Sequence, residues 1–374
     1  MKEEKQQNID RDEEEINIDN DEGIKEPFDP TKIRVDTRKI TIDLVLQRIK
    51  YQELNLAPEF QRRDDIWTND AKSRLIESIL IRIPLPAFYI DATDDDRWLI
   101  IDGLQRLTAL KQFLIDKSLK LTGLQYLTEL ENKTYDELQR KYQRRILETE
   151  LTLSIIEAGT PPEVKYNIFR RINTGGLPLS PQEIRHALNQ GESTNLLDRL
   201  AKLKEFTKVT NLNKSKKRKR MTDQEFILGF LAYSIYGYEK YNEFKSRDDF
   251  FVQTMQLINK NFSEEGLKNI ENKFKKSMIA AYNIFGKDAF RKISEQTSKR
   301  YPLNQALFEV WSVMLSQLND NDIELLKQRK NDLIEKLKYL IDNDKEFLES
   351  ISQATKKVET RFGRIENLIQ EVLR

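Results

Sequence analysis

Apolar and polar positions in the first half of the chain switch between the period of a helix and that of a strand. Apolar residues recur with helical spacing from Leu75 to Leu80, and two prolines, at positions 84 and 86, predict the end of that helix. Residues 87–91 and 97–101 are short apolar runs joined by an acidic turn, which predicts a hairpin. Strands mixed with helices in this way predict an α+β core.

The second half has few glycines and long amphipathic runs from about Leu196 onward, which predicts a mostly helical domain. We expect helices over residues 226–238, 247–260, 264–284, 303–318, 321–343 and 357–373. The sequence therefore predicts three parts, namely a tail over 1–31, an α+β domain over 32–195 and a helical domain over 196–374.

Charge is distributed unevenly although the net charge is only +1. Residues 1–30 carry twelve acidic and four basic side chains, a net charge of −8, so the remaining 344 residues carry about +9. This tail has few apolar residues and we expect it to be disordered. It either keeps the protein soluble or mimics nucleic acid by folding back over a basic surface.

A basic run lies in the helical half, over residues 214–220. Six of its seven side chains are cations: Lys214, Lys216, Lys217, Arg218, Lys219 and Arg220. Such a run makes phosphate contacts that do not depend on nucleic-acid sequence, and we expect it to dominate any DNA affinity. The alternative is a solvated loop.

The segment most informative about chemistry is Asp102-Gly103-Leu104-Gln105-Arg106, which follows an apolar strand and precedes a helical pattern. A strand-turn-helix junction presents free backbone N–H groups at the helix N-terminus, and these favour a phosphate. Gly103 permits close approach of a ligand and Arg106 supplies a forked cation. The alternative is a simple turn with a solvated Arg106.

Two further blocks change the interpretation of this junction. Upstream, Gln61 and Arg62 follow Glu59-Phe60, and a bidentate arginine there would bind phosphate unless it pairs with the adjacent aspartates. Downstream, Asn173 and Thr174 belong to the segment FRRINTGG and either bind the phosphate or ribose of a nucleotide or only shape the turn.

These three blocks, in this order, resemble the N-terminal domain family of GmrSD-type restriction enzymes over roughly residues 38–235. The family motif is usually DGQQR, and Leu104 replaces its first glutamine here. The resemblance implies a fold like that of the ParB/sulfiredoxin nucleotide-binding proteins. Many such proteins carry a C-terminal HNH nuclease domain, which needs histidines. His186 is the only histidine, so we expect no HNH domain, and we expect His186 to lie on a helix surface or at an interface.

The amino-acid composition excludes some kinds of binding site and some cellular locations. The absence of cysteine excludes disulfides and thiolate metal sites, and the absence of a long apolar run predicts no transmembrane helix. The N-terminus has no signal-peptide core, so we expect a cytoplasmic location. The residues predict neither the ligands of a metal nor the oligomeric state.

The preferred hypothesis is a nucleotide-binding module that hydrolyses nucleoside triphosphates slowly and acts as a regulator or sensor in DNA restriction or phage defence. The resemblance implies this function, with Mg²⁺ as the accompanying ion, DNA as a partner and a separate nuclease subunit as a further one. Asp102 and Arg106 are the candidate catalytic residues, and Gln61, Arg62, Gly103, Gln105, Arg106, Asn173 and Thr174 are the candidate nucleotide ligands. Two alternatives are a non-catalytic adaptor that binds DNA or protein, and a metal-dependent nuclease built on the ParB-like core.

Overall fold

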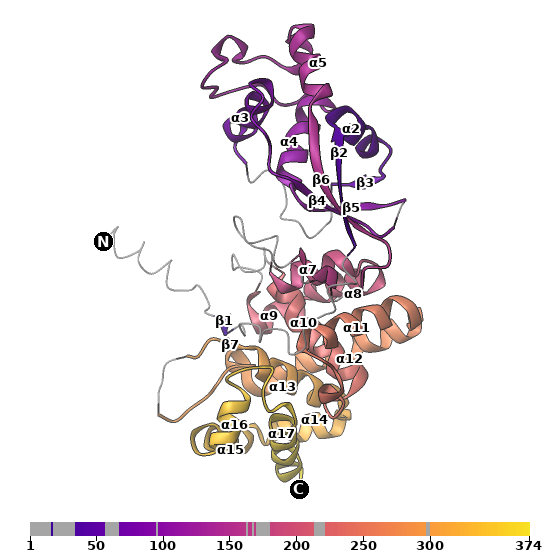
Figure 1. Cartoon of the computed structure of the whole chain (residues 1–374). Coiled ribbons are helices and arrows are strands. Elements are labelled where there is room, and N and C mark those ends of the chain that lie inside the picture. Colours follow the sequence, from indigo (N-terminus) through magenta and orange to yellow (C-terminus); the bar gives the residue numbers. More distant parts are fainter. Residues whose placement is uncertain are drawn as a thin grey trace, which may run out of the picture. The chain divides into compact units, whose positions relative to one another are not determined.

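The structure is a computed structural model in which the chain forms two compact units (Figure 1). It describes residues 16–17, 34–56, 67–94, 96–161, 164–166, 168–169, 180–212, 221–296 and 300–374. The N-terminal unit spans 28–179, and the helical unit comprises 1–27 together with 180–374. The predicted α+β class of the first part and the helical class of the second are both confirmed.

The N-terminal unit is built on a five-stranded mixed sheet in the order β2-β6-β4-β5-β3. The β2/β6 and β4/β5 pairs are antiparallel, whereas β6/β4 and β5/β3 are parallel. Its elements are β2 (Val35–Thr41), α2 (Ile42–Lys50), β3 (Leu54–Asn55), α3 (Asn69–Leu80), β4 (Phe88–Ala92), β5 (Trp98–Asp102), α4 (Leu104–Leu114), two short 3₁₀ turns (Thr128–Leu130 and Tyr135–Glu137), α5 (Arg140–Glu148) and β6 (Glu150–Glu157). Helix α3 packs against α4 and α5, and the buried faces of these helices close one apolar core over the sheet.

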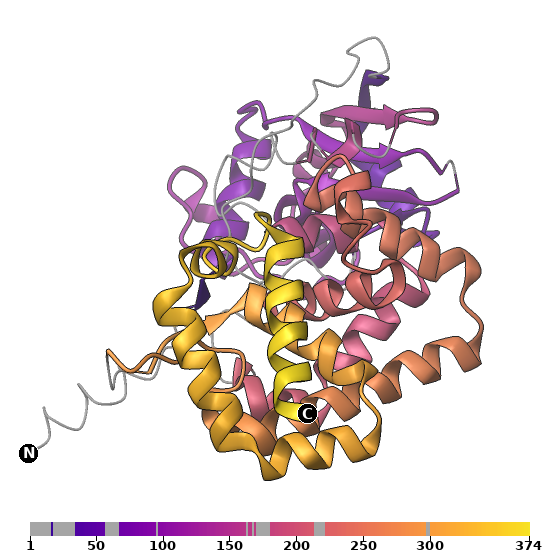
Figure 2. The same ribbon diagram turned by 90° about the horizontal axis from the view of Figure 1, so that it is seen from below.

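The helical unit holds its own apolar core, separate from that of the N-terminal unit. Its elements are β1 (Ile16–Asn17), α7 (Pro181–Leu188), α8 (Glu192–Ala201), α9 (Lys204–Thr210), α10 (Thr222–Tyr236), α11 (Arg247–Asn261), α12 (Glu264–Phe285), β7 (Leu303–Asn304), α13 (Gln305–Gln317), α14 (Asp320–Gln328), α15 (Lys330–Asn343), α16 (Lys345–Ser350) and α17 (Val358–Leu373). The C-terminal helix α17 packs against α13, α14, α15 and α16 (Figure 2). No helix in the described part of the chain is long and apolar enough to span a bilayer.

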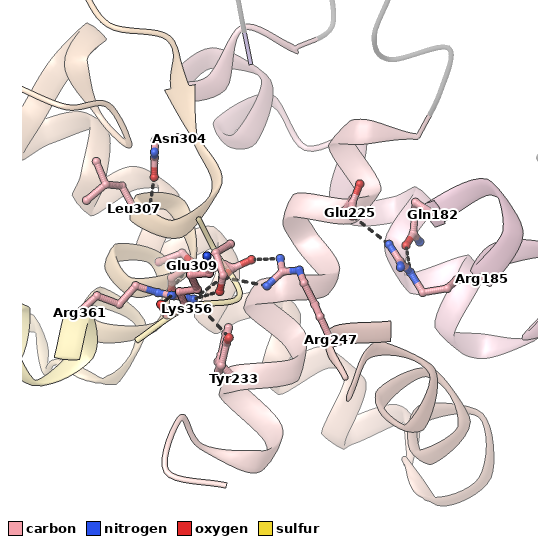
Figure 3. Close-up of polar contacts among 12 residues, drawn as sticks. Gln182, Arg185, Glu225, Tyr233, Arg247, Asn304, Leu307, Glu309, Lys356 and Arg361 are labelled. Carbon is pink, nitrogen blue, oxygen red and sulfur yellow. Dashed lines mark hydrogen bonds and ion pairs between the residues drawn. The ribbon is translucent and has the colours of Figure 1, made fainter. Parts of the chain in front are cut away.

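A buried charge network joins four of these helices (Figure 3). Glu309 of α13 is completely buried and pairs with Arg247 of α11 and with Arg361 of α17, whose Nη2 lies 3.1 Å from Oε2. The same Nη2 lies 3.3 Å from the hydroxyl of Tyr233 on α10, and burial raises the pKa of that tyrosine. A buried carboxylate without such partners is strongly destabilising, so the network fixes how these helices pack.

The boundary between the units differs from the predicted one at 195/196, because α7 belongs to the helical unit. Arg185 of α7 is buried and donates to Glu225 of α10 at 3.0 Å and to Asp248 of α11. His186, on the same helix, is also buried, with Nδ1 3.1 Å from Oε1 of Gln224. Of the two predicted positions, an exposed helix surface is therefore wrong, because α10 covers His186.

Three further differences concern local structure. The tail that we expected to be disordered contains β1, whose backbone pairs in parallel with β7, a partner almost three hundred residues away. The single predicted helix over 321–343 is divided into α14 and α15 at Arg329. Helix 303–318 begins two residues later than predicted, because Leu303 and Asn304 are taken up by β7.

Glu77 of α3 anchors the long loop that follows α4. Its carboxylate is 3% exposed and accepts backbone N–H groups from Gln125, Tyr126 and Leu127 at 2.7–3.1 Å. Burial raises the pKa of this carboxyl, but the three backbone donors outweigh burial and hold the pKa below 4.5.

This depressed pKa predicts a pH-dependent contribution to stability. Glu77→Gln should lower the free energy of unfolding by about 1.5–3 kcal/mol at neutral pH, since it removes hydrogen bonds to a charged acceptor. A group whose pKa is lower in the folded state stabilises the fold above its unfolded pKa, so the difference should shrink as pH falls below about 4.5. Urea unfolding from about pH 7 to about pH 3 measures this, with Glu129→Gln, an exposed carboxylate of the same loop, as control. A pH-independent difference would contradict an ionised Glu77.

Candidate functional site

The junction between β5 and α4 is the strand-turn-helix arrangement that the sequence predicts. Strand β5 ends at Asp102, α4 begins at Leu104, and only Gly103 lies between them. Gly103 is the N-cap of α4 with φ +101°, and no side chain caps the first turn. The neighbouring helices α2 and α3 are capped by the side chains of Thr41 and Thr68. The N-terminus of α4 therefore retains backbone donors that no capping side chain satisfies.

Gly103 is needed here for packing as well as for its backbone conformation. A Cβ atom at this position would overlap Cδ1 of Phe88 and lie 2.9 Å from Cε1 of the same ring. A positive φ is strained for residues with a side chain. The glycine therefore allows β4 and the start of α4 to pack directly against each other.

Arg106 is largely buried, with 11% of its side chain exposed, and it is not the solvated residue of the alternative interpretation. Its Nη1 donates to the carbonyl of Pro86, and its Nη2 donates to the carbonyl of Ala87 at 3.1 Å. The guanidinium also lies 4.1 Å from the ring centroid of Phe88. Burial lowers the pKa of Arg106, and Asp102 opposes that shift. Arg106 thus fixes the segment that leads into β4.

Asp102 completes the junction as a partly exposed carboxylate. Its Oδ2 accepts from Nη2 of Arg106 at 2.8 Å, while 39% of its side chain is exposed to solvent. Among the described residues no donor to Oδ1 occurs. The junction therefore combines an oriented carboxylate with the positive end of a helix dipole.

Gln105 and Leu104 differ in environment. Oε1 of Gln105 is buried and has no hydrogen-bond partner among the described residues. A buried amide oxygen without a partner is unfavourable unless a ligand or water satisfies it. Leu104 is partly buried and packs against the apolar core of the N-terminal unit.

Comparison with known proteins finds one family that is similar to this region. Residues 42–190 match the N-terminal domain of the GmrSD restriction endonuclease family. The matched segment contains the whole β5–α4 junction and both flanking sequence blocks.

For this similarity, residues 42–190 are called the GmrSD domain.

No curated protein matches the chain. The GmrSD assignment confirms the resemblance found in the sequence, and the family match includes α7 at its C-terminal end.

Several predicted ligands of the GmrSD domain lie outside the described residues. These are Gln61 and Arg62 upstream and Asn173 and Thr174 downstream. The basic run of the helical half, with Lys214, Lys216, Lys217, Arg218, Lys219 and Arg220, lies outside them as well. Their roles stay predictions. The structure brings together Asp102, Gly103, Gln105 and Arg106.

Sequence reasoning missed a buried ion pair in the GmrSD domain. Nζ of Lys165 lies 3.1 Å from Oδ2 of Asp91 at the end of β4 and 2.8 Å from Oγ1 of Thr93. Asp91 was visible as an acidic residue at the end of an apolar strand, but its partner is 74 residues away. The pair holds the segment after β6 against the end of β4.

Metal ligands in the GmrSD domain are sparse within the described ranges. No group of three or more histidine, aspartate or glutamate side chains there is arranged to hold a metal ion.

Arg106→Ala should destabilise the GmrSD domain. Replacing an exposed arginine would have only a small effect on stability. The loss of donors to Pro86 and Ala87 should cost about 2–4 kcal/mol, because it also leaves two carbonyls unsatisfied. Urea unfolding measures the effect, Arg106→Lys should restore part of it, and Arg97→Ala at an exposed position is the control. An unchanged midpoint in Arg106→Ala would show that these contacts contribute nothing.

Leu104→Gln tests the position at which the chain departs from the family motif. Since Leu104 packs partly against the core, the amide should lower the free energy of unfolding by about 1 kcal/mol. A melting curve alongside nucleotide titration separates packing from ligand contact. Tighter nucleotide binding with unchanged melting would show that the side chain faces the ligand instead.

Proposed function

We propose that the protein is a nucleotide-binding regulatory or sensor module of a DNA-restriction or phage-defence system, and that it hydrolyses a nucleoside triphosphate slowly. The match to a restriction endonuclease domain supports a role in DNA restriction or phage defence, and it is consistent with DNA as a partner. The fold we infer for the domain is ParB/sulfiredoxin-like, and the mixed sheet with an uncapped helix after β5 is compatible with it.

The observation that carries the proposal is the uncapped N-terminus of α4 beside the carboxylate of Asp102. Backbone N–H groups at a helix N-terminus bind phosphate oxygens and favour negative charge. The carboxylate would repel a triphosphate, so binding requires a divalent cation between the two groups. Mg²⁺ would neutralise phosphate charge there, and Asp102 is the residue that would hold it.

The other residues of the junction have supporting roles in this proposal. Arg106 orients Asp102 through the 2.8 Å contact and is a positioning residue, since its remaining printed contacts are to backbone carbonyls and to Phe88. In this proposal the buried oxygen of Gln105, which has no partner among the described residues, accepts a hydrogen bond from a ribose or from an attacking water. Gln61, Arg62, Asn173 and Thr174 remain proposed ligands from the flanking blocks.

A second candidate function is supported by one observation. Leu104 replaces an amide of the family motif and the guanidinium of Arg106 is occupied by structural contacts, so fewer side chains are available for catalysis. A site with few available catalytic side chains is what we expect of a non-catalytic adaptor, which binds nucleotide or DNA without turnover. The basic run over 214–220 remains the proposed DNA contact of the helical half, and a separate nuclease subunit remains a proposed partner.

Asp102→Asn tests the proposed site. It removes the charge needed to hold the cation and keeps the shape, so affinity for Mg²⁺-nucleotide should fall roughly ten- to a hundred-fold, equivalent to a charge-assisted contact. Isothermal titration with Mg²⁺-ATP and Mg²⁺-GTP measures affinity, and phosphate release with and without DNA measures turnover. Asp116→Asn, near the other end of α4, is the matched control.

The outcomes separate the candidates. Binding with phosphate release supports the NTPase, and binding without release supports the adaptor. Wild-type protein that binds neither nucleotide, or an Asp102→Asn variant that binds as tightly as wild type, would contradict the site.

A further inference from the structure

A groove on the N-terminal unit lies between α5 and the segment that joins α3 to β4. It encloses about 490 Å³. Aliphatic side chains from Ile79 to Leu85 and the end of α5 line it, and none of the residues from Asp102 to Arg106 does so.

The polar lining of the groove is mainly cationic. Arg82 projects from the α3–β4 segment, and Lys141, Arg144 and Arg145 come from α5. Two carboxylates, Glu148 and Glu150, also line it, so the groove carries a net charge of about +2 by formal charges. An excess of cations in a hollow raises the local concentration of anions.

Most of this positive charge is not used by the fold. Of the four cations, only Arg145 donates a hydrogen bond to another element in the described ranges, at 3.0 Å to the carbonyl of Leu80 at the end of α3. Arg144 lies 3.8 Å from Glu148, and both side chains are more than two-thirds exposed, so that pair is weak. Lys141 contacts only the ring of Tyr142, at 4.8 Å, within the described residues.

Arg82 is exposed and forms no ion pair with any described residue. It also has φ +66°, at the position after a helix where glycine or asparagine is usual. The chain thus places a long cation where the backbone disfavours one. Its side chain forms no hydrogen bond or ion pair with the part of the chain that the structure describes.

We propose that this groove binds the phosphate backbone of duplex DNA. Lys141 and Arg144 are one helical turn apart on α5, so each can meet a different phosphate, and Arg82 meets the strand from the opposite wall. The lining contains no aromatic ring on which a base would stack, and its apolar part is aliphatic. These features favour sequence-independent backbone contact over recognition of a free nucleotide.

This inference goes beyond the proposed function, because it assigns a DNA contact to the N-terminal unit rather than to the run over 214–220. The groove also adjoins the nucleotide site through one segment. Arg106 holds the carbonyls of Pro86 and Ala87, and the residues just before them line the groove. DNA in the groove would therefore contact the segment that Arg106 fixes.

The test uses the full chain with the triple variant Arg82→Gln, Lys141→Gln and Arg144→Gln, which leaves Arg145 and the 214–220 run intact. The control is Lys39→Gln, Lys50→Gln and Lys120→Gln, which removes the same charge from exposed positions of the same unit outside the groove. Fluorescence anisotropy with a labelled duplex of about 20 base pairs, from about 50 to about 200 mM salt, gives affinity and salt slope.

The groove variant should bind roughly ten-fold or more weakly at low salt, and its slope of log K against log salt should fall by about 2–3. The control should stay close to wild type. Equal losses in both variants, no loss in the groove variant, or no duplex binding by wild type at about 50 mM salt would each overturn the proposal. Loss of inorganic tripolyphosphate binding with unchanged duplex binding would also overturn it, in favour of a small anion.

Two controls keep the result interpretable. If the triple variant melts earlier than wild type, the single variants Arg82→Gln and Lys141→Gln replace it, since neither side chain has an ion pair with a described residue. Mg²⁺-ATP titration of the groove variant should match wild type. Failure of nucleotide binding in wild type would therefore contradict the proposed function and leave the groove result standing.

Discussion

Glu309 is completely buried, and its carboxylate is compatible with folding only because Arg247 and Arg361 reach it from two different helices. Removing a charge from water is costly unless hydrogen bonds and an opposite charge replace the solvent. The partners must therefore be in place when the core forms. This requirement fixes α11, α13 and α17 relative to one another more strictly than apolar packing alone, which tolerates many arrangements.

The same constraint shapes the N-terminal unit, where it bears on function. Glu77 is satisfied by three backbone N–H groups of a distant loop, and Arg106 by two backbone carbonyls and one carboxylate. In both cases a buried ion holds a segment without secondary structure. The segment held by Arg106 leads from α3 into β4, so the arginine stabilises the surroundings of the candidate site instead of facing its ligand. Asp102 is left partly exposed at the point where chemistry is proposed.

Local features of this fold could be predicted from the sequence because short-range rules control them. The turn at Gly103, the helix from Asn69 to Leu80 and the β4–β5 hairpin depend on residues within a few positions of one another. By contrast, β2 is extended from Val35 to Thr41 because it pairs with β6, which lies more than a hundred residues later in the chain. Helix α2 likewise stops at Lys50, since Leu54 pairs with Trp98.

The sequence was enough to predict which residues form the candidate site, but not what each of their side chains contacts. Arg106 could be recognised as important, yet its carbonyl partners lie 19 and 20 residues earlier in the chain. The groove was not predictable, because Arg82 and α5 are about sixty residues apart and are brought together only by the packing of α3 on α5. Similarly, long-range contacts limit the helices within residues 117–150 to α5 and two short 3₁₀ turns. Backbone N–H groups in this stretch bond instead to Glu77, Ser73 and Glu131.

The side chain of Glu309 also determines which residue can stand at position 229, in the middle of α10. A Cβ atom on this glycine would lie 2.6 Å from Oε1 and 2.8 Å from Cγ of Glu309, so the carboxylate occupies the space that any other residue would fill. Glycine is a poor helix former, and α10 retains one at its centre. A side chain at position 229 would therefore force the carboxylate of Glu309 to move. That movement would disturb the contacts of both buried arginines, so one missing methyl group in α10 is part of what holds α11 and α17 in place.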